Sequence, residues 1–255
     1  MWYRLRQVAL VAHPLDPVLA DFEAVLGLRV AFRDPAVAQF GLQNAVLPAG
    51  HQFVEVVSPV REGTTAGRYL ERRSGDGGYM AILQCAEHAP VKARVADLGI
   101  RKVVELDEHG YSIMQLHPRD TGGTFLEIDV QDGGEPLDGP WTPAGPAWQG
   151  ARTAQVQAIT AAEIQADDPG ALAQRWAQIL DLPVVASGER HEISLDLGAL
   201  RFVPAADGRG EGLGGVEVEV ADVDTVLSAA DARGLRRNDD VVLLGGVRVR
   251  ILPPG

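Results

Sequence analysis

Residues 7–30, QVALVAHPLDPVLADFEAVLGLRV, decide the fold of this 255-residue chain. The apolar run over 5–14 ends at a proline, which predicts a buried strand. A helix is predicted directly after it, because Pro17 stands at its start, apolar residues follow at helical spacing and Gly27 stands at its end. Strand-like segments come next: RVAFRD (29–34), FGLQNAVLPAG (40–50) and HQFVEVVSPV (51–60).

The same order of elements recurs along the chain. Residues 78–130 again predict a strand, a short helix and three strands. Residues 158–184, AITAAEIQADDPGALAQRWAQILDLPV, repeat the opening stretch, with the Asp-Pro before the helix and the Leu-x-Leu at its end. Residues 214–237 likewise repeat the module that begins at Tyr79. We therefore expect an α+β fold of four βαβββ modules in two tandem pairs.

A segment rich in proline, glycine and tryptophan separates the two pairs. Its sequence is GGEPLDGPWTPAGPAWQG, residues 133–150, and this composition is typical of a linker. We expect a first domain over 1–130, a linker over 131–152 and a second domain over 153–255.

Composition and charge narrow the class of function. The net charge of −12 argues against a nucleic-acid partner and gives no support for docking on anionic lipid. No stretch approaches the roughly 20 apolar residues of a membrane span, and the first apolar run is too short for a signal peptide. Cys85 is the only cysteine, which excludes an intramolecular disulfide and a Cys-rich zinc site. We expect a cytoplasmic protein with a small-molecule ligand; the oligomeric state, including a homodimer, stays open.

Three stretches and the module order carry a family resemblance. Residues 7–30, VLPAGHQFVEVVSP (46–59) and LHPRDTGGTFLEI (116–128) resemble the vicinal oxygen chelate superfamily, which includes glyoxalase I, methylmalonyl-CoA epimerase, bleomycin-resistance proteins and extradiol dioxygenases. The third stretch is similar to the closing motif of methylmalonyl-CoA epimerases. The resemblance implies that each pair of modules forms a U-shaped sheet around a cavity. It also implies a divalent metal that binds two substrate oxygens and stabilises an enolate.

The metal ligands of that superfamily carry over unevenly. Without gaps, its two histidine positions fall on Gln7 and Met80, and its two carboxylate positions fall on Glu55 and Glu127. Gln7, Glu55 and Glu127 form a candidate site for Mg, Mn, Ni or Zn, completed by water, whereas Met80 cannot help a hard ion. We expect Glu55 and Glu127 to converge on one cavity. Without a metal, their like charges should raise one pKa.

Three kinds of function stay open. An isomerase or lyase would act through an enolate on a small oxygenated molecule, with Glu127, Glu55 and His117 as acid–base groups. A metal-free protein of the bleomycin-resistance type would only bind and sequester its ligand, and a scaffold would bind none. In the first two, the side chains expected to line the cavity are Phe53, His51, Tyr79 and Met80.

The second half departs further from the superfamily pattern. Ala161 and Gly215 fall on the histidine positions, and Arg201 and Arg250 fall near the carboxylate positions, so we expect no metal there. The two arginines have two open interpretations: a site for an anionic group, or a degenerate half kept for packing. Residues 68–80, RYLERRSGDGGYM, are either a solvated connector or a flap over the cavity mouth.

Overall fold

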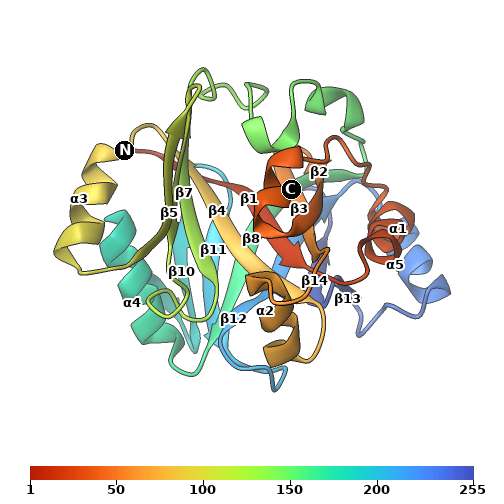
Figure 1. Cartoon of the computed structure of the whole chain (residues 1–255). Helices are drawn as coiled ribbons and strands as arrows, with labels where there is room; N and C mark the ends of the chain where they lie inside the picture. Colours follow the sequence, from red (N-terminus) through yellow and green to blue (C-terminus); the bar gives the residue numbers. More distant parts are fainter.

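The computed structural model describes residues 1–255 and contains two seven-stranded mixed sheets, one from each half of the chain (Figure 1). The first sheet has the order β2-β3-β1-β4-β7-β6-β5. Its strands are β1 (Tyr3–Val11), β2 (Leu42–Ala49), β3 (Gln52–Pro59), β4 (Gly77–Cys85), β5 (Lys102–Glu108), β6 (Tyr111–Leu116) and β7 (Phe125–Gln131). The helices of this half are α1 (Leu15–Leu26), the 3-10 helix η1 (Pro35–Phe40), α2 (Thr65–Arg73) and α3 (Ala89–Asp97).

The second sheet has the corresponding order β13-β14-β12-β8-β11-β10-β9. Its strands are β8 (Val156–Ala166), β9 (Val185–Ser187), β10 (Arg190–Ser194), β11 (Ala199–Pro204), β12 (Gly212–Val220), β13 (Val241–Leu244) and β14 (Val247–Leu252). The helices are α4 (Pro169–Leu180) and α5 (Val223–Ala232), and the 3-10 turns η2 (Thr142–Ala144) and η3 (Trp148–Ala151) lie between the halves. The predicted α+β fold of four modules in two tandem pairs is confirmed.

The first strands of paired modules meet at the middle of each sheet. In the first sheet, β1 pairs antiparallel with β4 and parallel with β3, the last strand of its own module. In the second sheet, β12 pairs antiparallel with β8 and parallel with β14. The strands expected to carry the site, β3, β1, β4 and β7, are therefore consecutive neighbours.

The first and the fourth modules each have two strands after their helix instead of the predicted three. Residues 29–34 contribute only an isolated bridge between Phe32 and Val46. Pro35 begins η1 at this point, and the carboxylate of Asp34 caps it by accepting a hydrogen bond from the backbone N–H of Ala36. The local turn chemistry therefore stops the chain from continuing along β2.

The two halves share one apolar core. It contains 51 buried residues, among them Val8 and Leu10 of β1, Ile164 of β8 and Val218 of β12. In Figure 1, α1 lies beside α5 and α3 beside α4, so helices of different halves pack in pairs. The side chain of Gln52 adds polar contacts, because its Nε2 donates to Ile159 O (2.6 Å) and its Oε1 accepts from Ile159 N (2.8 Å). A boundary between independently folding domains therefore stays a prediction.

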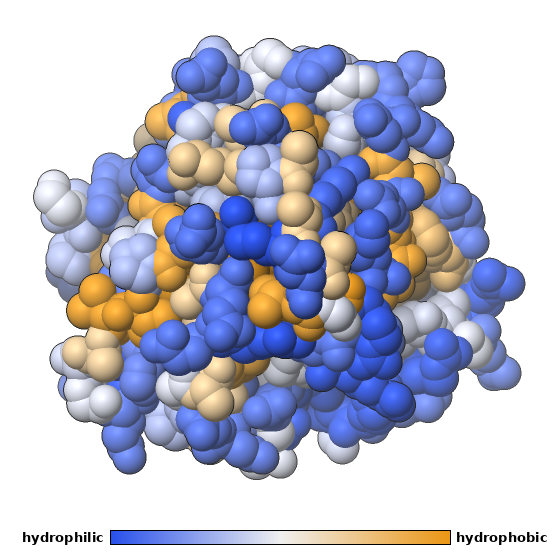
Figure 2. Space-filling model, turned by 90° about the vertical axis from the view of Figure 1, so that its left-hand side faces the viewer, coloured by the Kyte–Doolittle hydropathy of each residue, from blue (hydrophilic) through white to orange (hydrophobic).

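Most of the surface shown in Figure 2 is hydrophilic, and its apolar atoms lie in small separate patches. None of the helices is long and apolar enough to span a membrane.

Candidate functional site

Two irregularities in the first sheet place extra side chains on one of its faces. On β1 the pairing with β4 shifts between Leu5 and Gln7, so the intervening Arg6 is an extra residue, as in a β-bulge. Arg6 and Gln7 consequently both contact the indole of Trp141, although neighbouring residues of a regular strand face opposite ways. We call this face, which carries Gln7 and Glu55, the inner face.

The second irregularity lies on β4. Ala9 pairs with Met80 but Leu10 pairs with Gly78, so Tyr79 is the extra residue and turns to the inner face with Met80. Glu55, Gln7, Met80 and Glu127 thus lie on one face of four neighbouring strands, in the order β3, β1, β4, β7. They form two rows: Gln7 and Glu127 are both level with Ile82, whereas Glu55 and Met80 are both level with Ala9.

Glu55 is held by two amide side chains. Asn44 Nδ2 donates to Glu55 Oε1 (2.6 Å), and Gln7 Nε2 donates to Glu55 Oε2 (2.8 Å). Each amide is oriented by a second contact: Gln7 Oε1 accepts from Trp141 Nε1 (2.8 Å), and Asn44 Oδ1 accepts from the backbone N–H of Asp34 (2.8 Å). Both amides therefore present N–H groups, not oxygens, to the Glu55 carboxyl.

Glu127 belongs to a second polar group. Gln115 Nε2 donates to Glu127 Oε2 (2.6 Å) and lies 3.5 Å from Met80 Sδ. Asp129, two residues further along β7, accepts a hydrogen bond from Tyr111 OH (2.5 Å) and is close enough to Glu127 for the charge of Glu127 to act on it. Burial raises the pKa of Glu127, and burial together with the charge of Glu127 raises the pKa of Asp129 well above its ordinary value. A buried carboxyl pair of this kind favours holding a shared proton.

The structure brings Glu55 and Glu127 to one interior. They are 9% and 7% exposed. Burial, together with the charge of Glu127, raises the pKa of Glu55 to about 7. The hydrogen bonds from Asn44 and Gln7 act in the opposite direction and lower it. The carboxyl centre, as we call Glu55, Glu127 and Asp129, thus contains a group that both gains and loses a proton near neutral pH.

The segment predicted as a linker packs onto the inner face. Residues 134–151, which we call the cap, form the green turns at the top of Figure 1. Trp141 and Trp148 are each 1% exposed, and the ring of Trp148 meets that of Phe53 edge-on at 5.0 Å. Trp141 also meets Tyr111 edge-on at 5.6 Å. The cap therefore closes one end of the inner face with aromatic rings.

Helix α2 closes the other end. Tyr69 donates a hydrogen bond from its hydroxyl to Gly78 O and meets Tyr79 edge-on at 5.0 Å. Tyr79 in turn meets Phe125 at 5.0 Å. This arrangement agrees better with a flap over residues 68–80 than with a solvated connector.

The structure does not bring the two predicted histidines to the carboxyl centre. The ring of His51 lies 3.0 Å from Asp138 and 3.2 Å from Arg152, at the edge of the cap. His117 Nδ1 accepts a hydrogen bond from the backbone N–H of Arg119 within its own turn. No hydrogen bond joins either ring to Glu55 or Glu127.

The residues at the predicted metal position do not fit a divalent ion. Gln7 directs its N–H toward Glu55, and its oxygen is already bonded to Trp141. Met80 offers only a thioether, which a hard ion does not prefer. No cluster of three or more His, Cys, Asp or Glu side chains has the spacing to hold a metal. Turning the Gln7 oxygen toward an ion would leave the buried Trp141 N–H unpaired.

A double substitution, Gln7→His with Met80→His, is expected to create metal affinity. Two imidazoles would then stand between Glu55 and Glu127 on neighbouring strands and supply nitrogen ligands for a transition metal. We expect at least tenfold tighter Ni²⁺ binding than in the wild type by calorimetric titration, with Met80→His alone as the control. Unchanged affinity in a double variant with a wild-type circular dichroism spectrum would show that these strand positions do not converge as described.

The arginines of the second half are paired with carboxylates of the protein itself. Glu217, 5% exposed, pairs with Arg201 and lies 3.2 Å from Arg190 and 4.0 Å from Arg250. Arg201 also pairs with Glu192 at 2.8 Å, and Arg250 pairs with Asp240. Three guanidinium groups thus meet three carboxylates, an arrangement that favours the interpretation of a half kept for packing.

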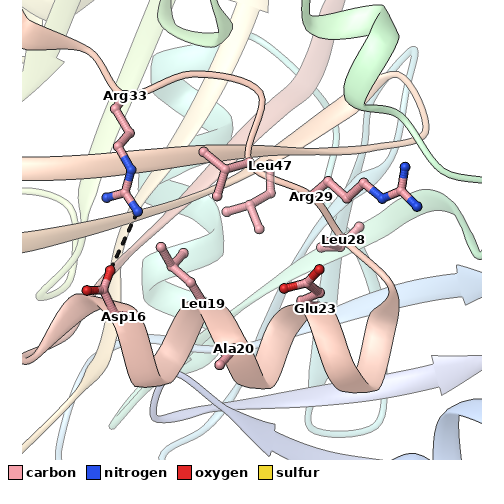
Figure 3. Close-up of a pocket in the computed structure, with 9 residues that line it drawn as sticks. Asp16, Leu19, Ala20, Glu23, Leu28, Arg29, Arg33 and Leu47 are labelled. Carbon is pink, nitrogen blue, oxygen red and sulfur yellow. Dashed lines mark ion pairs between the residues drawn. The ribbon is translucent and has the colours of Figure 1, made fainter.

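A separate surface hollow of about 360 Å³ lies between α1 and the segment that follows it (Figure 3). An ion pair between Asp16 and Arg33 spans it at 3.5 Å, and both side chains are more than half exposed. It contains none of the buried polar groups described above, so we assign the functional site to the inner face instead.

Several site residues were not expected from the sequence: Asn44, Gln115, Asp129, Arg6 and Trp141. The role of the two amides can be recognised only from the strand register, which places Asn44 and Gln115 beside the two glutamates. The burial of Trp141 and Trp148 could have been predicted from the sequence, because two tryptophans make a linker-like segment more hydrophobic than a solvated linker needs to be.

Comparisons with known proteins show the family and the fold of this chain. Residues 8–180 match a protein family described as a glyoxalase-like domain. Human mitochondrial methylmalonyl-CoA epimerase is 27% identical over 132 residues, which is 49% of this chain and 73% of the relative. A solved hypothetical protein from Staphylococcus aureus superposes with a TM-score of 0.68 at 12% identity, over 100% of both chains. A mutant 4-hydroxymandelate synthase from Streptomyces coelicolor gives 0.67 at 18% identity, over 93% of this chain and 77% of its own. At these identities the two structures show a common fold.

Proposed function

The chain belongs to the glyoxalase-like domain family, within the vicinal oxygen chelate superfamily, and on that premise we propose that its first half is an acid–base site that moves a proton on a small oxygenated molecule. The observation that supports this most is the pair of buried glutamates on β3 and β7, with the pKa of Glu55 raised to about 7. A buried carboxyl that titrates near neutral pH is matched to general acid–base catalysis.

The two glutamates have different partners and therefore different roles. Glu55 accepts hydrogen bonds from Asn44 and Gln7, which stabilise its ionised form, so it is the base that takes a proton from a carbon beside a carbonyl group. Glu127 lies beside Asp129 and burial raises the pKa of both, so this pair holds a proton and returns it to the resulting enolate. One proton leaves the substrate and one is added, which is the balance of an isomerase reaction.

A second candidate is a protein that binds a small molecule without converting it. The observation in its favour is the enclosure of the inner face at both ends, by Trp141 and Trp148 of the cap and by Tyr69 of α2. Aromatic rings around a few polar groups are common in binding pockets. The two candidates differ in whether Glu55 exchanges a proton with the ligand.

Proton exchange in heavy water tests the proposal. The protein is incubated with a panel of 2-oxo and 2-hydroxy acids and aldehydes in D₂O, and replacement of C–H by C–D is followed by proton NMR. Glu55→Gln should lower the exchange rate at least a hundredfold, since it removes the base while keeping the shape. The matched control is Glu62→Gln, on an exposed turn after β3, which should leave the rate unchanged.

Equal rates in the wild type and Glu55→Gln would remove Glu55 from the reaction. Binding of a panel compound without any exchange would favour the second candidate.

A further inference from the structure

Arg6 is a fully buried guanidinium with no carboxylate partner. It is 0% exposed, and its Nη1 donates to His51 O (2.5 Å) and to Leu137 O of the cap (3.1 Å). Its other two nitrogens, Nε and Nη2, have no hydrogen-bond partner. Asp138, the acid whose charge acts most on Arg6, is itself paired with Arg152 and His51.

Aromatic rings surround this cation. Arg6 Cζ lies 5.2 Å from the ring centre of Phe53, 5.5 Å from that of Trp141 and 5.8 Å from that of Trp148. Ring faces attract a cation, but they do not accept its N–H groups as a carboxylate does. Burial lowers the pKa of Arg6 to about 10, so the side chain stays charged at neutral pH. A buried charge with two unused donors is unfavourable unless something else pairs with it.

The two unused donors have a defined geometry. Nε and Nη2 lie on one edge of the planar guanidinium and direct their N–H groups the same way, which matches the two oxygens of a carboxylate. The rings of Phe53, Trp141 and Trp148 surround the guanidinium, so an anion paired with this edge would be shielded from water.

We propose that the Nε–Nη2 edge of Arg6 binds the carboxylate of a small organic acid between the inner face and the cap. The cap is the element that moves to admit it, because Leu137, Trp141 and Trp148 are its contacts with Arg6. Trp141 also bonds Gln7, which in turn bonds Glu55, so the anchor at Arg6 and the base at Glu55 are connected through one indole and one amide. This inference rests on the proposed function and narrows its substrates to carboxylic acids.

Calorimetric titration with lactate, pyruvate and propionate, each compared with its uncharged amide, tests the proposal. The wild type should bind at least one acid and not the matching amide. Arg6→Lys keeps the charge but loses the two-donor edge, so the affinity should fall at least tenfold. The matched control is Arg4→Lys on the same strand, which should leave the affinity within twofold because Arg4 stacks on Trp2 and reaches the cap only at its rim, through Glu135 O.

Two further measurements keep the test independent of folding and of catalysis. The Arg6 Nε–H resonance of the wild-type protein should shift when the bound acid is added, which requires no variant. Glu55→Gln should keep the affinity for the acid while losing proton exchange, so a failure of the base and a failure of the anchor give different results. The proposal is overturned if no acid binds, if amides bind as well as acids, if Arg6→Lys binds like the wild type, or if inorganic phosphate binds more tightly than every carboxylate.

Discussion

Replacing Trp141 with alanine is expected to destabilise the protein by about 4 kcal/mol, the usual cost of truncating a buried tryptophan. The indole is 1% exposed and packs against Phe53 and Tyr111. Its loss also leaves Gln7 Oε1 without its donor inside the protein. Urea unfolding followed by circular dichroism measures the change in free energy.

Trp2→Ala is the matched control for this substitution. Trp2 is only partly buried and stacks on Arg4, with the guanidinium carbon 4.3 Å from the ring centre. We expect its loss to cost far less than that of Trp141. If both variants lost the same small free energy, the cap would not be packed on the inner face as described.

As the pH rises from 4.5 to above 7, the wild type is expected to lose about 3 kcal/mol of unfolding free energy that Glu55→Gln keeps. The unfolded carboxyl ionises near 4.5, whereas burial keeps the folded one protonated up to about 7. Between these values the unfolded wild-type protein binds fewer protons than the folded one, so rising pH favours unfolding. Each pKa unit corresponds to about 1.4 kcal/mol, and glutamine has no such dependence.

Urea unfolding at pH 5 and pH 8 measures this effect as the difference between the two proteins at each pH. Glu62→Gln, on the exposed turn, should follow the wild type. A difference between Glu55→Gln and the wild type that does not change with pH would mean that Glu55 ionises as an ordinary carboxyl in the folded protein.

Much of the fold follows from local sequence. The recurrence of 7–30 in 158–184 predicted the modules and their pairing, and the resemblance to the vicinal oxygen chelate superfamily is confirmed by the family match. The same resemblance predicted that Glu127 turns inward, whereas strand alternation alone favoured an outward-facing acid; it is 7% exposed. These features depend on residues close together in the chain.

The details of the site depend on contacts between distant residues. The bulges at Arg6 and Tyr79 bring both side chains onto the inner face, and no local pattern marks where an extra residue enters a strand. The partners of the glutamates, Asn44 and Gln115, lie on β2 and β6, so their role depends on strand register. Register is settled by packing of the whole sheet, which the sequence of one strand does not contain.

The position of the cap likewise could not be predicted from the local sequence. Proline and glycine in 133–150 correctly predicted irregular structure, but linker composition does not state which surface the segment covers. Trp141 and Trp148 are buried only because Phe53, Arg6 and Tyr111 form a complementary surface more than twenty residues away in sequence.

The most direct test of a proton-transfer site is the pKa of Glu55 itself. Carboxyl ¹³C NMR titration of the wild type and of Glu127→Gln gives it, with Glu55→Gln assigning the resonance. We predict that Glu55 titrates near pH 7 in the wild type and at a lower pH in Glu127→Gln, because the charge of Glu127 contributes to the raised value. A Glu55 resonance that titrates near 4.5 in both proteins would contradict a buried acid–base group at this position.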